Sequence, residues 1–173
     1  NSSLSAQTKR GKILSANKKI LAYSENNEAG DEIRHYPYEN MFAHIIGYTS
    51  YGKAGLEAVC NKDLLTSHEK LMKQLSNGVA SQKNIGDNVI TTLDTRLQKA
   101  AYEALDDYRG AVVAIEPKTG KVRALVSKPD FDPNKLDDMW NKITSDSSQS
   151  CLLNRATQGL YPPGSTYKIL TAL

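Results

Sequence analysis

The sequence predicts an α+β fold, in which short antiparallel strands and amphipathic helices occupy separate stretches of the chain. Two β-rich runs, 110–116 and 121–127, flank a Pro-Lys-Thr-Gly turn that is typical of a hairpin. A second pair of short strands is expected around the Asn-Lys turn within residues 10–23. Helical periodicity then follows Asp94, so helices and strands both contribute.

Three helices are expected before residue 160. Asp94 is the predicted N-cap of one whose apolar stripe consists of Leu97, Ala101, Ala104, Leu105 and Tyr108. An earlier stretch, Asp63 to Leu75, has a fair apolar face, and a glycine-containing polar link over 78–86 follows it. The third helix is expected over 136–143.

Composition narrows the class of protein. The 173 residues include 39% hydrophobic and 24% charged side chains, enough to bury the core of one domain, or of a small domain plus part of another. The net charge of +3 comes without a Lys/Arg cluster, which argues against nucleic-acid binding. The longest apolar run, Ala111 to Ile115, is too short for a transmembrane helix or a signal peptide.

Cysteine and histidine show no metal-binding pattern. Cys60 and Cys151 are too few for a disulfide framework, and their spacing to His35, His44 and His68 fits no metal site. One structural bridge or two unpaired core residues are the alternatives, and the second is favoured. We predict no cofactor and no metal.

Residues 161–168, Tyr-Pro-Pro-Gly-Ser-Thr-Tyr-Lys, are the stretch most suggestive of catalysis. The prolines and glycine form a rigid turn, which puts Ser165 in the first turn of a helix. Free N–H groups and the helix dipole there favour a hydroxyl that loses its proton. Lys168 lies on the same helical face, as a base beside a nucleophile would. A lysine base must be partly neutral, so the pair is expected to be buried in a folded site.

Spacing alone does not establish this interpretation. Ser-x-x-Lys occurs four times, beginning at Ser15, Ser50, Ser67 and Ser165, and only the last copy follows a proline-glycine turn and opens an apolar helix. The alternative is that Ser165 is an ordinary N-cap and Lys168 a solvent-exposed lysine.

Residues 153–168 resemble the active-site serine segment of the penicillin-binding proteins, in which Asn-Arg-Ala is followed, a few residues on, by Pro-Gly-Ser-Thr-Phe-Lys. Tyr167 stands where Phe is commoner. The resemblance implies that Ser165 is the catalytic nucleophile and Lys168 its base, with the Ser165 backbone N–H as one oxyanion donor.

The resemblance extends along most of the chain. Residues 10–13, Arg-Gly-Lys-Ile, and three segments between 34 and 57 are similar to the non-catalytic pedestal of class B members. Residues 92–98, Thr-x-Asp-x-x-Leu-Gln, resemble the start of the transpeptidase domain. We therefore expect a pedestal domain over 1–86 and the first part of a transpeptidase domain, an antiparallel sheet with helices, over 87–173.

Several residues within these segments look catalytic but are expected to be structural. We expect His44 to be a structural histidine and Glu57 a salt-bridge or capping residue.

The chain departs from the family pattern at residues 15–18. It has Ser-Ala-Asn-Lys where the family usually has Asp-Arg-Asn-Gly, so the buried ion pairs attributed to that segment cannot all be carried over.

The later catalytic motifs of the family also have misleading copies. Lys-Thr-Gly at 118–120 and Ser-x-Asn at 15–17 and 24–26 all precede Ser165, whereas the family's motifs follow its serine. No further copy follows Ser165, so we expect this chain to be the N-terminal portion of a longer enzyme and to be inactive alone.

The resemblance implies a serine-type peptidoglycan D,D-transpeptidase that cross-links stem peptides through an acyl-enzyme and is acylated by β-lactams. A serine β-lactamase or β-lactam sensor is one alternative, but a pedestal has no use there. A non-catalytic division or sporulation scaffold is the other. Implied partners are stem peptides, β-lactams and a membrane glycosyltransferase or polymerase contacted through the pedestal. The expected location is the extracytoplasmic face of the bacterial cell membrane, through an N-terminal anchor missing from this chain.

Overall fold

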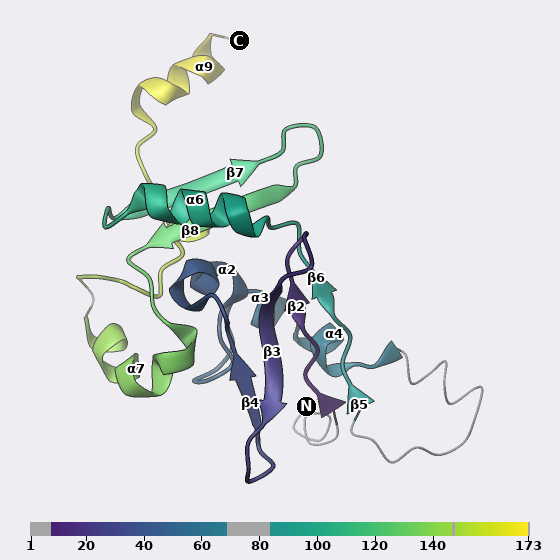
Figure 1. The fold of residues 1–173 in the computed structure, drawn as a ribbon. Helices are drawn as coiled ribbons and strands as arrows, with labels where there is room; N and C mark the ends of the chain where they lie inside the picture. The colour runs from purple at the N-terminus through teal and green to yellow at the C-terminus, as the bar shows by residue number, and fades with distance from the viewer. Residues whose placement is uncertain (1–7, 69–83, 147, 173) are drawn as a thin grey trace.

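The computed structural model describes residues 8–68, 84–146 and 148–172 (Figure 1). Within these ranges the strands form a four-stranded sheet of order β4-β3-β2-β6, a two-stranded pair β1-β5 and a separate hairpin β7-β8. Helices pack beside each sheet rather than alternating with parallel strands (Figure 1). The predicted α+β class is confirmed.

The N-terminal sheet begins as the sequence indicates. Its strands and the pair beside it are β1 (Thr8–Lys9), β2 (Ile13–Leu14), β3 (Ile20–Asn26), β4 (Glu32–His35), β5 (Asn84–Ile85) and β6 (Val89–Ile90). β2 and β3 are antiparallel, as expected around the Asn-Lys turn. The expectation of a plain link over 78–86 is wrong at its end, because β5 pairs in parallel with β1. β6 likewise pairs in parallel with β2, so residues distant in sequence complete this sheet.

Short helical elements cover this sheet and contribute to its core. They are η1 (Glu39–Phe42), α2 (Ala43–Ile46), α3 (Gly55–Val59) and α4 (Asn61–Leu65). The core includes Ile13, Leu21, Phe42, Ile46, Leu64 and Leu93. The helix expected from Asp63 to Leu75 is wrong in its bounds, since α4 ends at Leu65 and Thr66 is extended. The part of that prediction beyond residue 68 lies outside the described residues.

Glu57 lies at the centre of a buried ion-pair network. Its carboxylate oxygens accept hydrogen bonds from Arg10 Nε at 2.6 Å and Arg34 Nε at 2.7 Å, and Glu57 itself is fully buried. Arg10 also donates to the Glu57 carbonyl and to Asn61 Oδ1. The structural role predicted for Glu57 is therefore confirmed. The network joins β4 to α3 and to the segment that precedes β2.

Helix α6 (Thr95–Leu105) begins at the predicted cap, where Asp94 accepts hydrogen bonds from the N–H groups of Arg96 and Leu97. The predicted apolar stripe is wrong, because Leu97 is 42% exposed and Tyr108 is 75% exposed beyond the helix end. The buried face instead carries Gln98. Its amide serves backbone groups of the neighbouring elements, which an apolar residue could not do.

The hairpin consists of β7 (Gly110–Ile115) and β8 (Val122–Lys128) and is antiparallel throughout, as predicted. Figure 1 shows α6 lying across it. After β8, η2 (Pro133–Lys135) is capped by Asp132, and α7 (Leu136–Ser145) covers the predicted third helix. A second core, which includes Phe131, Leu136 and Ile143, joins α7 to α2.

Candidate functional site

The candidate segment begins at α8 (Arg155–Gln158), whose N-cap Asn154 accepts a hydrogen bond from Ala156 N–H. The chain then runs to η3 (Gly164–Tyr167) and α9 (Lys168–Thr171). Gly164 has a φ of +55°, a conformation that favours glycine at this turn. Ser165 thus lies at the start of a helical segment, as the sequence indicates. That segment begins as a 3₁₀ turn.

The 3₁₀ turn determines how Ser165 and Lys168 are presented. With three residues per turn, side chains three apart lie above one another, so the two share one side of the segment. Both are exposed, as is Ile169 at 76%, and Figure 1 shows α9 standing away from the rest of the fold. The burial that a lysine base requires is not supplied by the described residues. The catalytic assignment of the pair stays a prediction.

Arg155 fixes the segment that leads to Ser165. It is buried, and its guanidinium donates to the carbonyls of Gln149 at 2.8 Å and Ser150 at 3.2 Å. Its backbone N–H donates to Ser127 Oγ at 2.9 Å, and that hydroxyl donates to the Leu153 carbonyl. Burial lowers the Arg155 pKa. Sequence reasoning missed this role, because the acceptors are backbone carbonyls, which every residue type has.

The misleading motif copies have structural partners. Lys-Thr-Gly at 118–120 lies at the hairpin turn, where Thr119 Oγ1 donates to Glu116. Ser24 lies in β3 and accepts a hydrogen bond from Arg34. The Ser15 hydroxyl donates to Asn17, whose amide donates in turn to Thr95. These contacts give each copy a structural role apart from Ser165.

His44 lies in the packed junction between α2 and the loop after β8. Its Nε2 is 3.3 Å from the Pro129 carbonyl, and its ring meets that of Phe131 edge to face. Burial lowers the His44 pKa, and no hydrogen bond joins it to Ser165 or Lys168 in the ranges that the structure describes. These contacts agree with the structural role expected for His44.

Two other features bear on what the site can do. Cys60 and Cys151 are free thiols rather than a bridge. Among the described residues, no group of three His, Cys, Asp or Glu side chains could hold a metal ion. None of the helices in the described ranges combines the length and apolar character that a membrane crossing requires.

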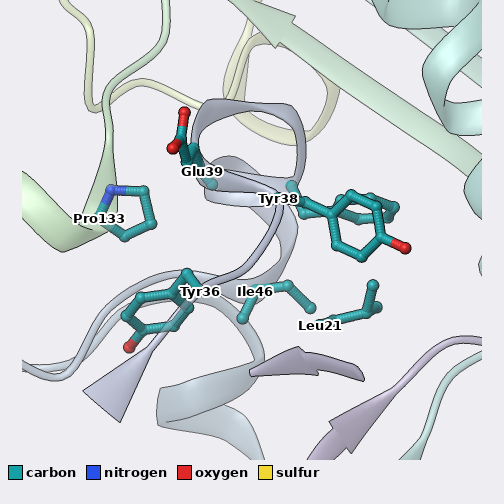
Figure 2. A pocket seen from close by; sticks show the side chains of 8 residues that line it. Leu21, Tyr36, Tyr38, Glu39, Ile46 and Pro133 are labelled. Carbon is teal, nitrogen blue, oxygen red and sulfur yellow. The ribbon is translucent and has the colours of Figure 1, made fainter. Parts of the chain in front are cut away.

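The apolar pocket shown in Figure 2 is not a ligand site. Tyr36, Tyr38, Leu21, Ile46 and Pro133 gather around it, but it has no room for a water molecule. It is a packing seam between the N-terminal sheet, η1 and η2.

Two family models match the chain. The model described as "Penicillin binding protein A dimerisation domain" matches residues 10–89, and the "Penicillin binding protein transpeptidase domain" matches residues 110–173. The segment with Ser165 and Lys168 lies in the second match. The boundary expected between 86 and 87 stays a prediction.

Curated relatives point to the same group of proteins. Peptidoglycan D,D-transpeptidase PbpA of Mycolicibacterium smegmatis is 38% identical over 94% of this chain and 36% of its own length. Peptidoglycan D,D-transpeptidase MrdA of Escherichia coli is 33% identical over 83% of this chain and 28% of its own length. The chain therefore spans about a third of the length of these relatives.

Solved structures extend the likeness to the fold. Penicillin-binding protein A of M. tuberculosis, solved as an imipenem acyl-enzyme complex, matches with a TM-score of 0.84 at 35% identity. That match covers 95% of this chain and 41% of the other. Pseudomonas aeruginosa PBP2, solved with WCK 5153, matches with a TM-score of 0.78 at 32% identity and covers 96% of this chain and 40% of the other.

Proposed function

Since this chain belongs to the class B penicillin-binding proteins, we propose that it carries the acylating serine of a peptidoglycan D,D-transpeptidase. The observation that carries the proposal is the position of Ser165 and Lys168. They lie on one side of a glycine-led helical turn, within the matched transpeptidase segment. The relatives named D,D-transpeptidases and the structural neighbour solved as a β-lactam acyl-enzyme complex support the same chemistry.

In the proposed acylation, Ser165 Oγ forms a bond to the carbonyl carbon of the penultimate D-alanine of a stem peptide. Lys168 accepts the hydroxyl proton and returns a proton to the amine of the leaving terminal D-alanine. The Ser165 N–H, close to the start of η3, is one donor to the developing oxyanion. An amine from a neighbouring stem then attacks the ester, forms the cross-link and releases Ser165. No cofactor enters either step.

For this chemistry the exposed pair must become enclosed. A fully hydrated lysine is protonated at neutral pH and cannot accept a proton, so walls beyond the described residues have to desolvate Lys168. The isolated chain is therefore expected to be inactive, and the assay belongs on the full-length protein.

We predict that the full-length protein gains one β-lactam mass and that peptide mapping places the adduct on Ser165. Ser165→Ala should abolish the adduct. Lys168→Ala should slow acylation by about 10²–10⁴-fold, the range of one general base. Ser50→Ala is the matched control, because Ser50 and Lys53 have the same spacing and should not affect acylation.

A folded full-length protein that no β-lactam acylates would contradict the assignment and favour a scaffold. If acylation occurs, incubation with a stem pentapeptide and an acceptor amine separates transpeptidation from hydrolysis. Cross-linked dimer is the expected product. Rapid turnover of the β-lactam itself would indicate a β-lactamase instead.

The proposal includes a location and a partner. We place the protein at the extracytoplasmic face of the bacterial cell membrane, held by an N-terminal anchor, with the pedestal contacting a membrane glycosyltransferase or polymerase. Fractionation of cells with an antibody to residues 8–68 tests the location, and recovery in the soluble cytoplasmic fraction would contradict it. Crosslinking from pedestal positions tests the partner.

A further inference from the structure

A cavity of about 220 Å³ lies between the α2–α3 corner and the segment that contains α8. One water needs only about 10–15 Å³ measured in this way, so the cavity has room for a small ring. Polar and aromatic side chains line it: His44, Tyr48, Phe131, Asn154, Thr157 and Gln158. It differs from the seam of Figure 2, which has no room for a water molecule.

Close backbone packing fixes the walls of this cavity. Gly47 has a φ of +80°, and a Cβ there would lie 2.0 Å from the Ala54 carbonyl oxygen. Asn154 Nδ2 donates to the His44 carbonyl at 3.2 Å, which ties the α8 wall to the α2 wall. The cavity is therefore preformed rather than opened by a moving loop.

The lining indicates a neutral ligand. Within the described part of the chain, no Lys, Arg, Asp or Glu side chain lines the cavity. A charged ligand would lose its hydration there without a counter-charge, which is costly. Stem peptides carry carboxylates and amines, so they fit this lining poorly.

The remaining chemistry favours a sugar. The half-buried ring of Tyr48 offers apolar surface, and the buried ring of Phe131 packs against it edge to face, at 77° with centroids 5.7 Å apart. Nothing in the described ranges hydrogen-bonds to the Thr157 hydroxyl or the Gln158 side-chain N–H group. Both are therefore available to hydroxyl or acetamido groups of a ligand.

We propose that this cavity binds one neutral, N-acetylated sugar ring, packed against Tyr48 and hydrogen-bonded to Thr157 and Gln158. That this sugar belongs to a glycan strand of the cell wall rests on the proposed function. Residues 159–164 connect the α8 wall directly to Ser165. A glycan strand bound at this site would therefore be held only a few residues along the chain from the acylating serine.

The test is titration of the full-length protein with N,N′-diacetylchitobiose, a neutral N-acetylated disaccharide called chitobiose below, monitored by saturation-transfer NMR at roughly millimolar concentrations. Thr157 is exposed, so Thr157→Phe can fill the cavity without disturbing a core. We expect it to weaken binding by at least about tenfold, and Gln158→Leu to weaken it as well. Thr144→Phe, at an exposed α7 position outside the cavity lining, is the control and should leave binding unchanged.

Thermal melts first establish that each variant is folded. Chitobiose binding that Thr157→Phe leaves intact, or no binding by the folded wild type, would overturn the proposal. The proposal would also be overturned if a sugar-free stem peptide binds instead of chitobiose and the same variants abolish binding of that peptide. Acylation is measured on the same wild-type sample. Acylation without sugar binding would contradict only the proposed sugar site. Sugar binding without acylation would contradict only the proposed function.

Discussion

At Glu57 a single carboxylate satisfies two arginines from different segments, and the cost of losing it can be measured. Glu57→Gln removes the charge but keeps the shape, leaving Arg10 and Arg34 buried with no counter-charge from this position. Breaking a buried pair in this way costs about 3–5 kcal/mol. A large drop in the urea midpoint of the full-length protein is expected.

Glu116→Gln is the control for that change. Glu116 pairs with Arg123 at 2.7 Å, but both side chains are about one-third exposed. Exposed pairs contribute about 0–1 kcal/mol, so this midpoint should move little. Equal shifts in the two variants would show that the Glu57 network adds nothing beyond a surface pair.

His44 gives a prediction about pH. Burial lowers its pKa below the ordinary value of 6.5, so below that pH the unfolded chain binds more protons than the folded one. The stability due to neutral His44 is complete above pH 6.5 and falls as the pH drops toward its folded pKa. Melts between about pH 7.5 and pH 5 should therefore decline less steeply in His44→Asn than in the wild type.

His68→Gln is the comparison, because the His68 side chain is exposed and pairs with Asp87 at the surface. Because exposed pairs contribute only about 0–1 kcal/mol, His68→Gln should leave most of the wild-type decline in place. If His44→Asn has the same pH slope as the wild type, protonation of His44 does not limit stability in acid.

The roles of single residues differ in how far they could be predicted from the sequence. Asp94 could be identified as a cap because its partners lie within the next three residues. The acidic character of Glu57 suggested an ion pair, although not which arginines it meets. The role of Gln98 could not be predicted, since it bonds backbone groups that only folding brings near. The role of Arg155 could not be predicted because its guanidinium bonds backbone carbonyls of the preceding loop, which any sequence there would supply.

Between elements, Gln98 is the link that joins α6 to the hairpin. Its Nε2 donates to the carbonyls of Met41 and Leu125 at 2.7 and 2.8 Å, and its Oε1 accepts from Leu125 N–H at 2.8 Å. Gln98→Leu keeps the volume but leaves these groups unpaired, at about 1–3 kcal/mol for each that stays buried. We expect a loss of at least about 2 kcal/mol in chemical unfolding.

Lys99→Leu is the matched control, since it makes the same kind of change at the adjacent, exposed position of α6. It should alter stability by no more than about 0.5 kcal/mol. If Gln98→Leu is equally mild, water replaces the lost amide and the other contacts of α6 are enough to hold it.

Elements were predictable where their pairing is local. The β7-β8 hairpin follows from its turn and two β-rich runs, and β2-β3 from a similar turn. The sequence from Asn88 predicts a strand that runs into α6, and β6 confirms it, but its parallel pairing with β2 was not predictable because the two lie more than 70 positions apart. β5 was not predictable as a strand, because it has only two residues and pairs with a strand equally far away. The α6 stripe misled because Leu97, Ala104 and Tyr108 are exposed, while Gln98 occupies the buried position.

For the whole molecule, the distribution of exposed apolar side chains indicates how the chain relates to the rest of its protein. Val113 and Ile115 alternate along β7 and are 44% and 55% exposed. Leu160, Ile169 and Leu170 are exposed as well. Relatives are nearly three times as long, and we predict that in the full-length protein further chain covers the outward face of β7.

Replacing Val113 and Ile115 together by threonine tests this, because threonine keeps strand propensity and removes apolar surface. If the face is covered, the full-length double variant should lose about 1–3 kcal/mol of stability.

In the 173-residue chain alone the same face should be exposed to solvent. The isolated chain should bind a hydrophobic dye, lack a sharp cooperative melt, and bind less dye after the same substitutions. Lys118→Thr, in the exposed hairpin turn, is the control for introducing a threonine outside this face. An unchanged full-length melt, or a dye-free cooperative melt of the isolated chain, would show that this face of β7 is a true outer surface.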